Sequence, residues 1–333
     1  MSKQQSLIIR GIAILLMLAY HLHDISDSYT SLIYIGGHPF TYYVNNMANP
    51  VCFFILLSGY GLSYTYGKYT FEEKIWKLLK LYTTYWIVLL LFPIGIGSFI
   101  APELYPGTWY EIISNATGYR WSYNIHYWFL LSYAILFLSS EYIQKLVNKK
   151  WGDIIVVVVS LILYFVTSYI VSRYRTGFFR IQYIYVSLLT IKLLFPFVVG
   201  MVMERLNRQG RLLCQKLTPP IAIILLISIV VLRSIFHTHA LNPFFAIIVI
   251  YLLIHVQFGI YTEKVLVELG KYSMPMWFIH GYFTIYLFQD YLCVLRYPLL
   301  IYLALVTVSY FLSIPIMKIS SFLYTHKYGK RCL

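Results

Sequence analysis

The chain has 333 residues, of which 60% are hydrophobic and only 11% are charged. Soluble domains carry about 25% charged residues, so a soluble globular protein is excluded because its surface could not be covered. The net charge of +14 would suit a nucleic-acid-binding protein, but the basic residues are spread between apolar runs, and we expect no nucleic acid partner.

Ten apolar runs follow one another along the chain. A transmembrane helix needs about 20 mainly apolar residues, and barrel strands are disfavoured because runs such as 154–162 do not alternate in hydrophobicity. We therefore predict an all-α, polytopic transmembrane bundle that forms one membrane-embedded domain over residues 1–333. The expected spans are 7–23, 47–66, 76–98, 126–144, 154–172, 181–203, 219–236, 241–258, 273–291 and 297–317.

Basic residues concentrate in alternate segments between these runs. Lys77, Lys149, Arg208 and Lys264 all fall in segments on the same side as the N-terminus. Because cytoplasmic loops of membrane proteins are enriched in Lys and Arg, both termini are predicted to be cytoplasmic, and the expected location is the plasma (inner) membrane with the lipid bilayer as partner.

Several polar residues lie in or beside the apolar runs. Ionisable groups at membrane depth cost free energy and are candidates for function. No Asp or Glu lies deep in an expected span, which disfavours a proton- or cation-coupled transporter. Lys192 also has a structural reading, since a lysine can extend along the helix to a polar partner. The candidates are Arg10, His21, His126, Trp128, Lys192 and His280.

Two further groups have both a functional and a structural interpretation. Lys74, Lys77 and Lys80 recur every three residues, which on a helix keeps them within an arc of roughly 120°. From composition alone they are a positive cluster that could meet anionic lipid. Ser58 is a further polar candidate, although with Gly59 and Gly61 it also fits a close-packing point. Zinc, Ser-His-Asp and Walker motifs are missing, so we expect no metal site and no tightly bound cofactor.

Five short segments carry further information through their order and spacing. They are Arg10-Gly11 with His21 eleven residues after the Arg, the run Phe53–Tyr60, the basic stretch Phe71–Tyr82, His126–Leu130, and Leu269–Ser273 followed by His280. Together they resemble the acyltransferase-3 family, whose members O-acylate glycans, lipopolysaccharide, peptidoglycan and antibiotics. The resemblance covers most of the chain.

The resemblance implies an enzyme that moves an acetyl or other short acyl group from acyl-CoA, as co-substrate, to a hydroxyl of a glycan or cell-surface polysaccharide. It implies His21 and Arg10 as catalytic residues and Lys74, Lys77 and Lys80 as ligands of coenzyme A phosphates. A neutral His is suited to remove a hydroxyl proton near pH 7, so His21 is expected to act as general base or as transient acyl carrier.

The chain departs from the family pattern in places. Its inner-loop cations are Lys where the family usually has Arg, and Thr83 stands where the family has Pro. No soluble SGNH-type domain is expected at the C-terminus. A transporter or flippase for a lipid-linked glycan remains the alternative function. A third reading is an inactive partner of polysaccharide biosynthesis enzymes in an export complex.

Overall fold

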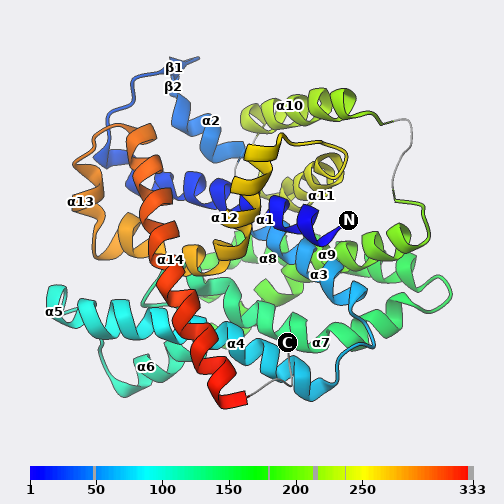
Figure 1. Cartoon of the computed structure of the whole chain (residues 1–333), viewed down its shortest axis with the longest axis horizontal. Coiled ribbons are helices and arrows are strands. Elements are labelled where there is room, and N and C mark those ends of the chain that lie inside the picture. Colours follow the sequence, from blue (N-terminus) through cyan, green and yellow to red (C-terminus); the bar gives the residue numbers. More distant parts are fainter. Residues whose placement is uncertain (48–49, 179–180, 213–216, 237, 329–333) are drawn as a thin grey trace.

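The computed structural model of the protein describes residues 1–333 except 48–49, 179–180, 213–216, 237 and 329–333. The described residues are almost entirely helical, which confirms the predicted all-α class (Figure 1). The elements are α1 (Lys3–Tyr20), η1 (His21–Ser28), β1 (Tyr34–Ile35), β2 (His38–Pro39), α2 (Phe40–Met47), α3 (Val51–Tyr64), α4 (Phe71–Leu89), η2 (Leu90–Gly97), α5 (Ser98–Ile100), α6 (Trp109–Ala116), η3 (Ile125–Phe129), α7 (Leu130–Val147), α8 (Gly152–Phe178), α9 (Gln182–Arg208), α10 (Pro219–Ile235), η4 (His239–Leu241), α11 (Asn242–Leu253), α12 (Ile260–Ile279), η5 (Tyr282–Tyr286), α13 (Gln289–Cys293) and α14 (Pro298–Tyr328).

Six helical segments of the described chain are long and apolar enough to cross a membrane. The protein is therefore a multi-pass membrane protein. The helices α10 and α11 are also apolar but shorter. The number of ten spans and the cytoplasmic position of both termini stay predictions. The six segments are Lys3–Ser26, Phe40–Tyr64, Phe71–Ile100, Gly152–Tyr174, Gln182–Arg208 and Pro298–Tyr324.

Helix type or helix bounds differ from the expectation at two places that matter for the site. The expected first span of 7–23 lies within the segment Lys3–Ser26, but the helix type changes inside it, because α1 ends at Tyr20 and a tighter 3-10 helix begins at His21. The ninth span was expected over 273–291, whereas α12 already begins at Ile260 and ends before His280. Its N-terminal half and middle carry charged residues such as Glu263 and Lys271. A prediction based on apolar runs does not include such residues in a span.

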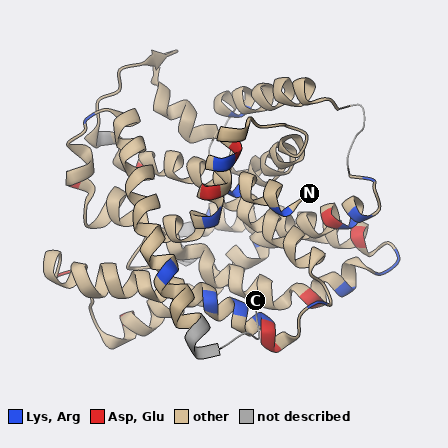
Figure 2. Cartoon of the chain, viewed as in Figure 1, with Lys and Arg blue, Asp and Glu red and all other residues tan. Residues whose placement is uncertain are grey.

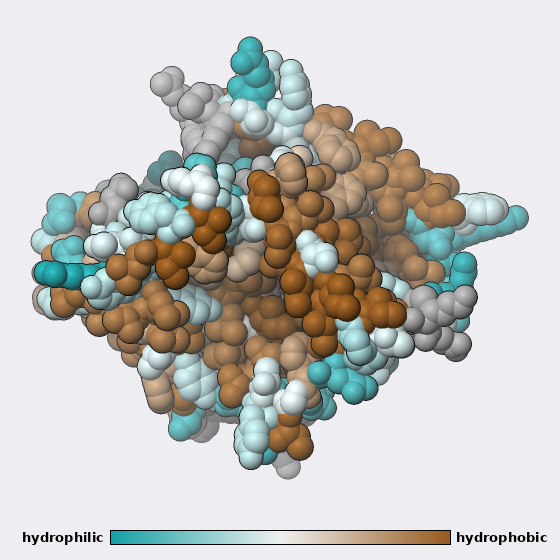
Figure 3. Space-filling view, turned by 90° about the horizontal axis from the view of Figure 1, so that it is seen from above, coloured by the Kyte–Doolittle hydropathy of each residue, from teal (hydrophilic) through white to brown (hydrophobic). Residues whose placement is uncertain are grey.

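The surface has the character of a membrane protein. Figure 3 shows hydrophobic residues over a broad area of one face, with hydrophilic residues gathered toward its margins. Exposed large side chains along the long helices include Ile154, Ile162, Leu303 and Phe311. Lys and Arg gather mainly toward the end of the bundle where the N-terminus lies (Figure 2), which is the distribution expected if that end faces the cytoplasm.

Two glycines hold α1 directly against α12. A Cβ atom at Gly11 would overlap the carbonyl oxygen of Leu266, and one at Gly270 would overlap that of Leu7. Only the absence of side chains permits this approach of two backbones. The reciprocal contacts place Gly11 and Gly270 at one level of two parallel helices. Ten residues further along each chain are His21 and His280, so equal rise brings these two imidazoles to one level.

The same device joins α3 to α9. A Cβ atom at Gly59 would overlap the carbonyl oxygen of Phe197, and one at Gly200 would overlap that of Leu56. The predicted close-packing point in 58–61 is therefore confirmed for Gly59. It was wrong for Gly61, which has nothing within contact distance of its missing Cβ. These two rigid helix pairs form the frame in which the polar residues are placed.

Candidate active site

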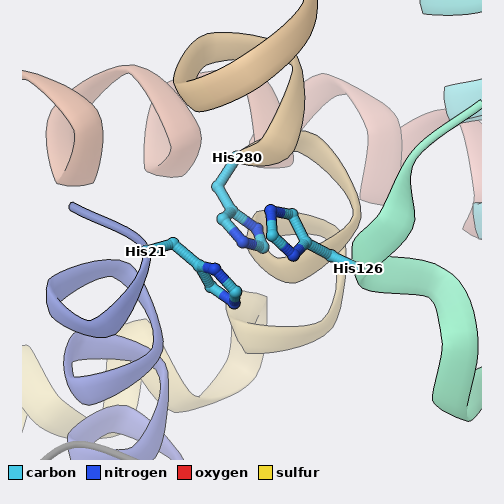
Figure 4. A group of neighbouring side chains, drawn as sticks. All are labelled: His21, His126 and His280. Atoms are coloured by element: carbon cyan, nitrogen blue, oxygen red, sulfur yellow. The ribbon is translucent and has the colours of Figure 1, made fainter. Parts of the chain in front are cut away.

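Three histidines from distant parts of the chain meet inside the bundle (Figure 4). His21 begins η1, His126 lies in η3, and His280 is the residue that caps α12. The ring centroids of His21 and His126 are 3.7 Å apart, and His280 lies 4.9 and 4.7 Å from them. Two imidazolium ions at such distances would repel strongly, so the cluster is suited to hold one proton rather than several.

Asp24 orients the imidazole of His21. Its Oδ2 accepts a hydrogen bond of 2.9 Å from His21 Nδ1. A carboxylate oxygen can only accept, so Nδ1 carries the proton and Nε2 of neutral His21 keeps its lone pair. The pairing depends on the local helix type, because side chains three residues apart eclipse in a 3-10 helix. The same Oδ2 lies 3.4 Å from His126 Nε2.

His280 has its tautomer set by its own helix. Its Nδ1 donates to the carbonyl oxygen of Trp277 at 2.7 Å, so Nε2 bears the lone pair. His126 Nε2 has the Asp24 carboxylate beside it, whereas the buried Nε2 atom of His280 has no hydrogen-bond partner among the described residues. Because an unsatisfied buried polar atom costs free energy, His280 Nε2 favours a ligand with its own hydrogen-bonding groups at the cluster.

Gly281 lets η3 approach α12. A Cβ atom at Gly281 would lie within 3 Å of both the Asn124 side chain and the His126 ring. Asn124 in turn caps η3, because its Oδ1 accepts from the backbone N–H of His126 at 3.0 Å. The glycine after His280 therefore allows the two histidines to stack.

A cavity of about 310 Å³ is lined by residues of α1, α3, α4, α7 and α12. Arg10, Lys77 and Lys80 supply its positive charge, and most of its remaining lining is apolar or aromatic. Among the described residues, no carboxylate lies within ion-pair distance of these three cations. Ser58 also lines the cavity, with its hydroxyl donating to the Phe54 carbonyl at 2.7 Å. The cavity is suited to an anion attached to an apolar group, and we call it the cationic cavity.

The three lysines of the predicted phosphate cluster separate in the structure. Lys77 and Lys80 line the cationic cavity. Lys74 is buried, donates to Ser140 Oγ at 3.1 Å and pairs with Glu141 Oε1 at 3.1 Å. The cause is the helical repeat, which turns Lys74 about 120° away from Lys80 and toward α7. Lys74 thus joins α4 to α7.

A second, larger cavity of about 770 Å³ lies directly against the cluster. His21, Asp24 and His126 line it, together with Trp128 and Lys192. Further aromatic and hydroxyl-bearing residues complete the wall, among them Tyr20, Trp121, Tyr164, Ser168, Ser172 and Tyr185. Such a mixture of flat aromatic surface and hydrogen-bonding groups is suited to a polar organic ligand, and we call this the aromatic cavity.

The two cavities share no lining residue. Phe129 and Trp277 line the cationic cavity, and their ring centroids are 4.1 Å apart. Each belongs to the segment that also carries one histidine of the cluster, since His126 precedes Phe129 by three residues and His280 follows Trp277 by three. The aromatic pair is therefore adjacent in sequence to two histidines of the cluster.

The cluster also has the composition of a metal site. One ligand atom from each histidine lies within 4.8 Å of the others, and three imidazoles with an adjacent carboxylate are a ligand set that zinc accepts. The sequence-based expectation of no metal site stays a prediction, because spacing along the chain could not show these three residues together.

Comparison with known proteins agrees with the geometry. The profile of a family described as an acyltransferase domain, Acyl_transf_3, matches residues 8–318. The chain belongs to the acyltransferase-3 family. No curated protein and no solved structure matches it. The matched range includes all members of the histidine cluster and both cavities' charged residues, so the membrane acyltransferase domain spans nearly the whole chain.

The structure brings most of the predicted site residues of this acyltransferase together. His21, His126 and His280 form the cluster, Arg10, Ser58, Lys77 and Lys80 line one cavity, and Trp128 and Lys192 line the other. Asp24 was not among the predicted site residues, because it falls directly after the expected first span of 7–23. Its position three residues after His21 is the one feature of the sequence that could have indicated a contact between the two side chains.

Proposed function

We propose that this membrane acyltransferase transfers an acetyl or other short acyl group from acyl-CoA to a hydroxyl of a glycan or cell-surface polysaccharide. The observation that supports the proposal most directly is the histidine cluster at the wall of the aromatic cavity, together with a separate cationic cavity lined by Phe129 and Trp277, its neighbours in sequence. A cationic cavity suits a donor with phosphates, and an aromatic, hydroxyl-rich cavity suits a sugar. We place the protein in the plasma (inner) membrane, where the donor is available on the cytoplasmic side.

In the proposed reaction, His21 Nε2 removes the proton of the acceptor hydroxyl. The hydroxyl oxygen attacks the thioester carbonyl carbon, a C–O bond forms and the C–S bond breaks. The sulfur leaves with the electron pair and takes the proton from the imidazolium, so the products are an ester and coenzyme A. In the alternative reaction, the same Nε2 lone pair attacks the thioester carbonyl, and a transient acyl-imidazole forms as the C–S bond breaks. The acceptor hydroxyl then takes the acyl group from the imidazole in a second step.

The donor side follows from the cationic cavity. Arg10, Lys77 and Lys80 bind coenzyme A phosphates, since an arginine forms paired hydrogen bonds with phosphate and lysines act as point charges. The thioester then points toward Phe129 and Trp277.

Deletion of the protein tests the function. Surface glycan from cells that lack it is expected to lose the mass of one acyl group per modified sugar, and the wild-type gene should restore that mass. The measurement is mass spectrometry of purified glycan. A glycan with unchanged acylation but changed amount or location would instead indicate a flippase.

The donor site is tested by the double variant Lys77→Gln/Lys80→Gln. Hydrogen bonds to charged groups contribute about 1.5–3 kcal/mol each, so acyl-CoA should bind at least about tenfold more weakly to purified protein in calorimetry. Lys77→Arg/Lys80→Arg should retain most of the affinity. The matched control, Lys149→Gln/Lys150→Gln, removes two exposed lysines outside the cavity lining and should bind normally. Normal binding by the Lys77→Gln/Lys80→Gln protein would remove these lysines from the donor site.

A further inference from the structure

Lys192 is the feature of the aromatic cavity that the proposed reaction does not use. It lies ten residues into α9, one of the membrane-spanning segments, so it is about 15 Å from the start of that helix. A lysine at this depth costs free energy unless a partner stabilises its charge. Its side chain lines the cavity rather than reaching either end of the helix.

The described residues provide little compensation for that charge. No carboxylate lies within ion-pair distance of Lys192 Nζ. Its nearest recorded partner is the ring of Tyr164, whose centroid is 5.9 Å away, and such a contact stabilises a cation by about 0.5–2 kcal/mol. The thiol of Cys52 also lines the cavity.

The acidic residue of the cavity lining is already engaged. Asp24 is the one acidic side chain in the described lining, and its Oδ2 serves His21 and His126. Arg233 lies outside the cavity lining, and its guanidinium donates to the Thr238 carbonyl and the Asn242 side chain. Lys192 is thus the one Lys or Arg in the described lining of this cavity, and it has no anionic partner within the described chain.

We infer that the acceptor carries an anionic group, a carboxylate or a phosphate, that binds the Lys192 ammonium in the aromatic cavity. This inference rests on the proposed function, because it assigns the aromatic cavity to the acceptor. The cavity volume of about 770 Å³ falls within the usual range of ligand sites, roughly 300–1,000 Å³. An anion at Lys192 would fix the orientation of the sugar, while a hydroxyl of the same molecule reaches His21.

The test is a binding measurement without acyl donor. Three radiolabelled probes are compared by equilibrium dialysis with the purified full-length protein in detergent: glucose, glucuronic acid and glucose 1-phosphate. At least one anionic sugar should bind about tenfold or more tightly than glucose, because a charged hydrogen bond contributes that much. The preference should weaken with added salt. Preference for glucuronic acid indicates a uronic acid acceptor, and preference for glucose 1-phosphate indicates a phosphorylated one.

Variants of Lys192 assign the preference to this residue. Lys192→Met and Lys192→Gln should bind all three sugars alike, whereas Lys192→Arg should keep a preference for the anionic probe. Lys271→Met is the matched control, since Lys271 is exposed and pairs with Glu268 at 2.9 Å outside the cavity; it should bind as the wild type does.

Three results would overturn the inference: no measurable binding of either anionic sugar, equal binding of all three sugars to the wild type, or an unchanged preference in Lys192→Met. The wild-type comparison needs no variant, so it decides the inference even if Lys192→Met does not fold. Failure of the proposed function is a separate result, because it is read from the acyl content of the glycan.

Discussion

His21→Gln is expected to abolish detectable acylation of the surface glycan while the protein still inserts in the membrane. Glutamine can hydrogen-bond to Asp24 but cannot take up the proton of the acceptor hydroxyl. Loss of a general base lowers a rate by about 10²–10⁴-fold. The measurement is the acyl content of the glycan by mass spectrometry, beside the amount of membrane-inserted protein.

The neighbouring His23 provides the control. Its side chain is exposed, and it does not line either cavity. His23→Ala should therefore acylate the glycan at the wild-type level. Wild-type acylation by His21→Gln would show that the histidine at position 21 is structural, and the proposed reaction would have to be abandoned.

Asp24→Asn should reduce acyl transfer about 10²–10⁴-fold, although Asp24 itself exchanges no proton with substrate. An amide can donate to His21 Nδ1 as well as accept from it, so the proton can move to Nε2 and the base is lost. Loss of the aspartate in the Ser-His-Asp triad has such an effect for this reason. Asp24 is thus a positioning residue for His21.

The kinetic signature separates positioning from a general loss of structure. In purified protein, Asp24→Asn should lower kcat while the affinity for acyl-CoA, whose proposed site is the other cavity, stays unchanged. Asp290→Asn serves as control because Asp290 is exposed in α13 and lines neither cavity. A fall in acyl-CoA affinity equal to the fall in rate would instead mean that Asp24 supports the fold.

The sequence by itself determined the class of fold and much of the site's composition. Apolar runs of spanning length can only be helices in lipid, because lipid offers backbone groups no other partner, and the all-α class followed. His21, Arg10 and Lys192 stood out since each carries a polar group where an apolar side chain would be favoured. Gly59 was predicted as a packing point because small residues permit helix contact.

Only the tertiary structure decided which of these residues act together. His126 and His280 are 154 residues apart in the sequence, and their meeting depends on the backbone contact at Gly281. Asp24 reached His21 because the helix tightens at His21, a change that hydrophobicity does not report. Lys74 left the phosphate cluster because the helical repeat turned it toward Glu141. Composition and periodicity describe the sequence over one or two helical turns. The site, in contrast, arises from contacts between helices that are distant in the chain.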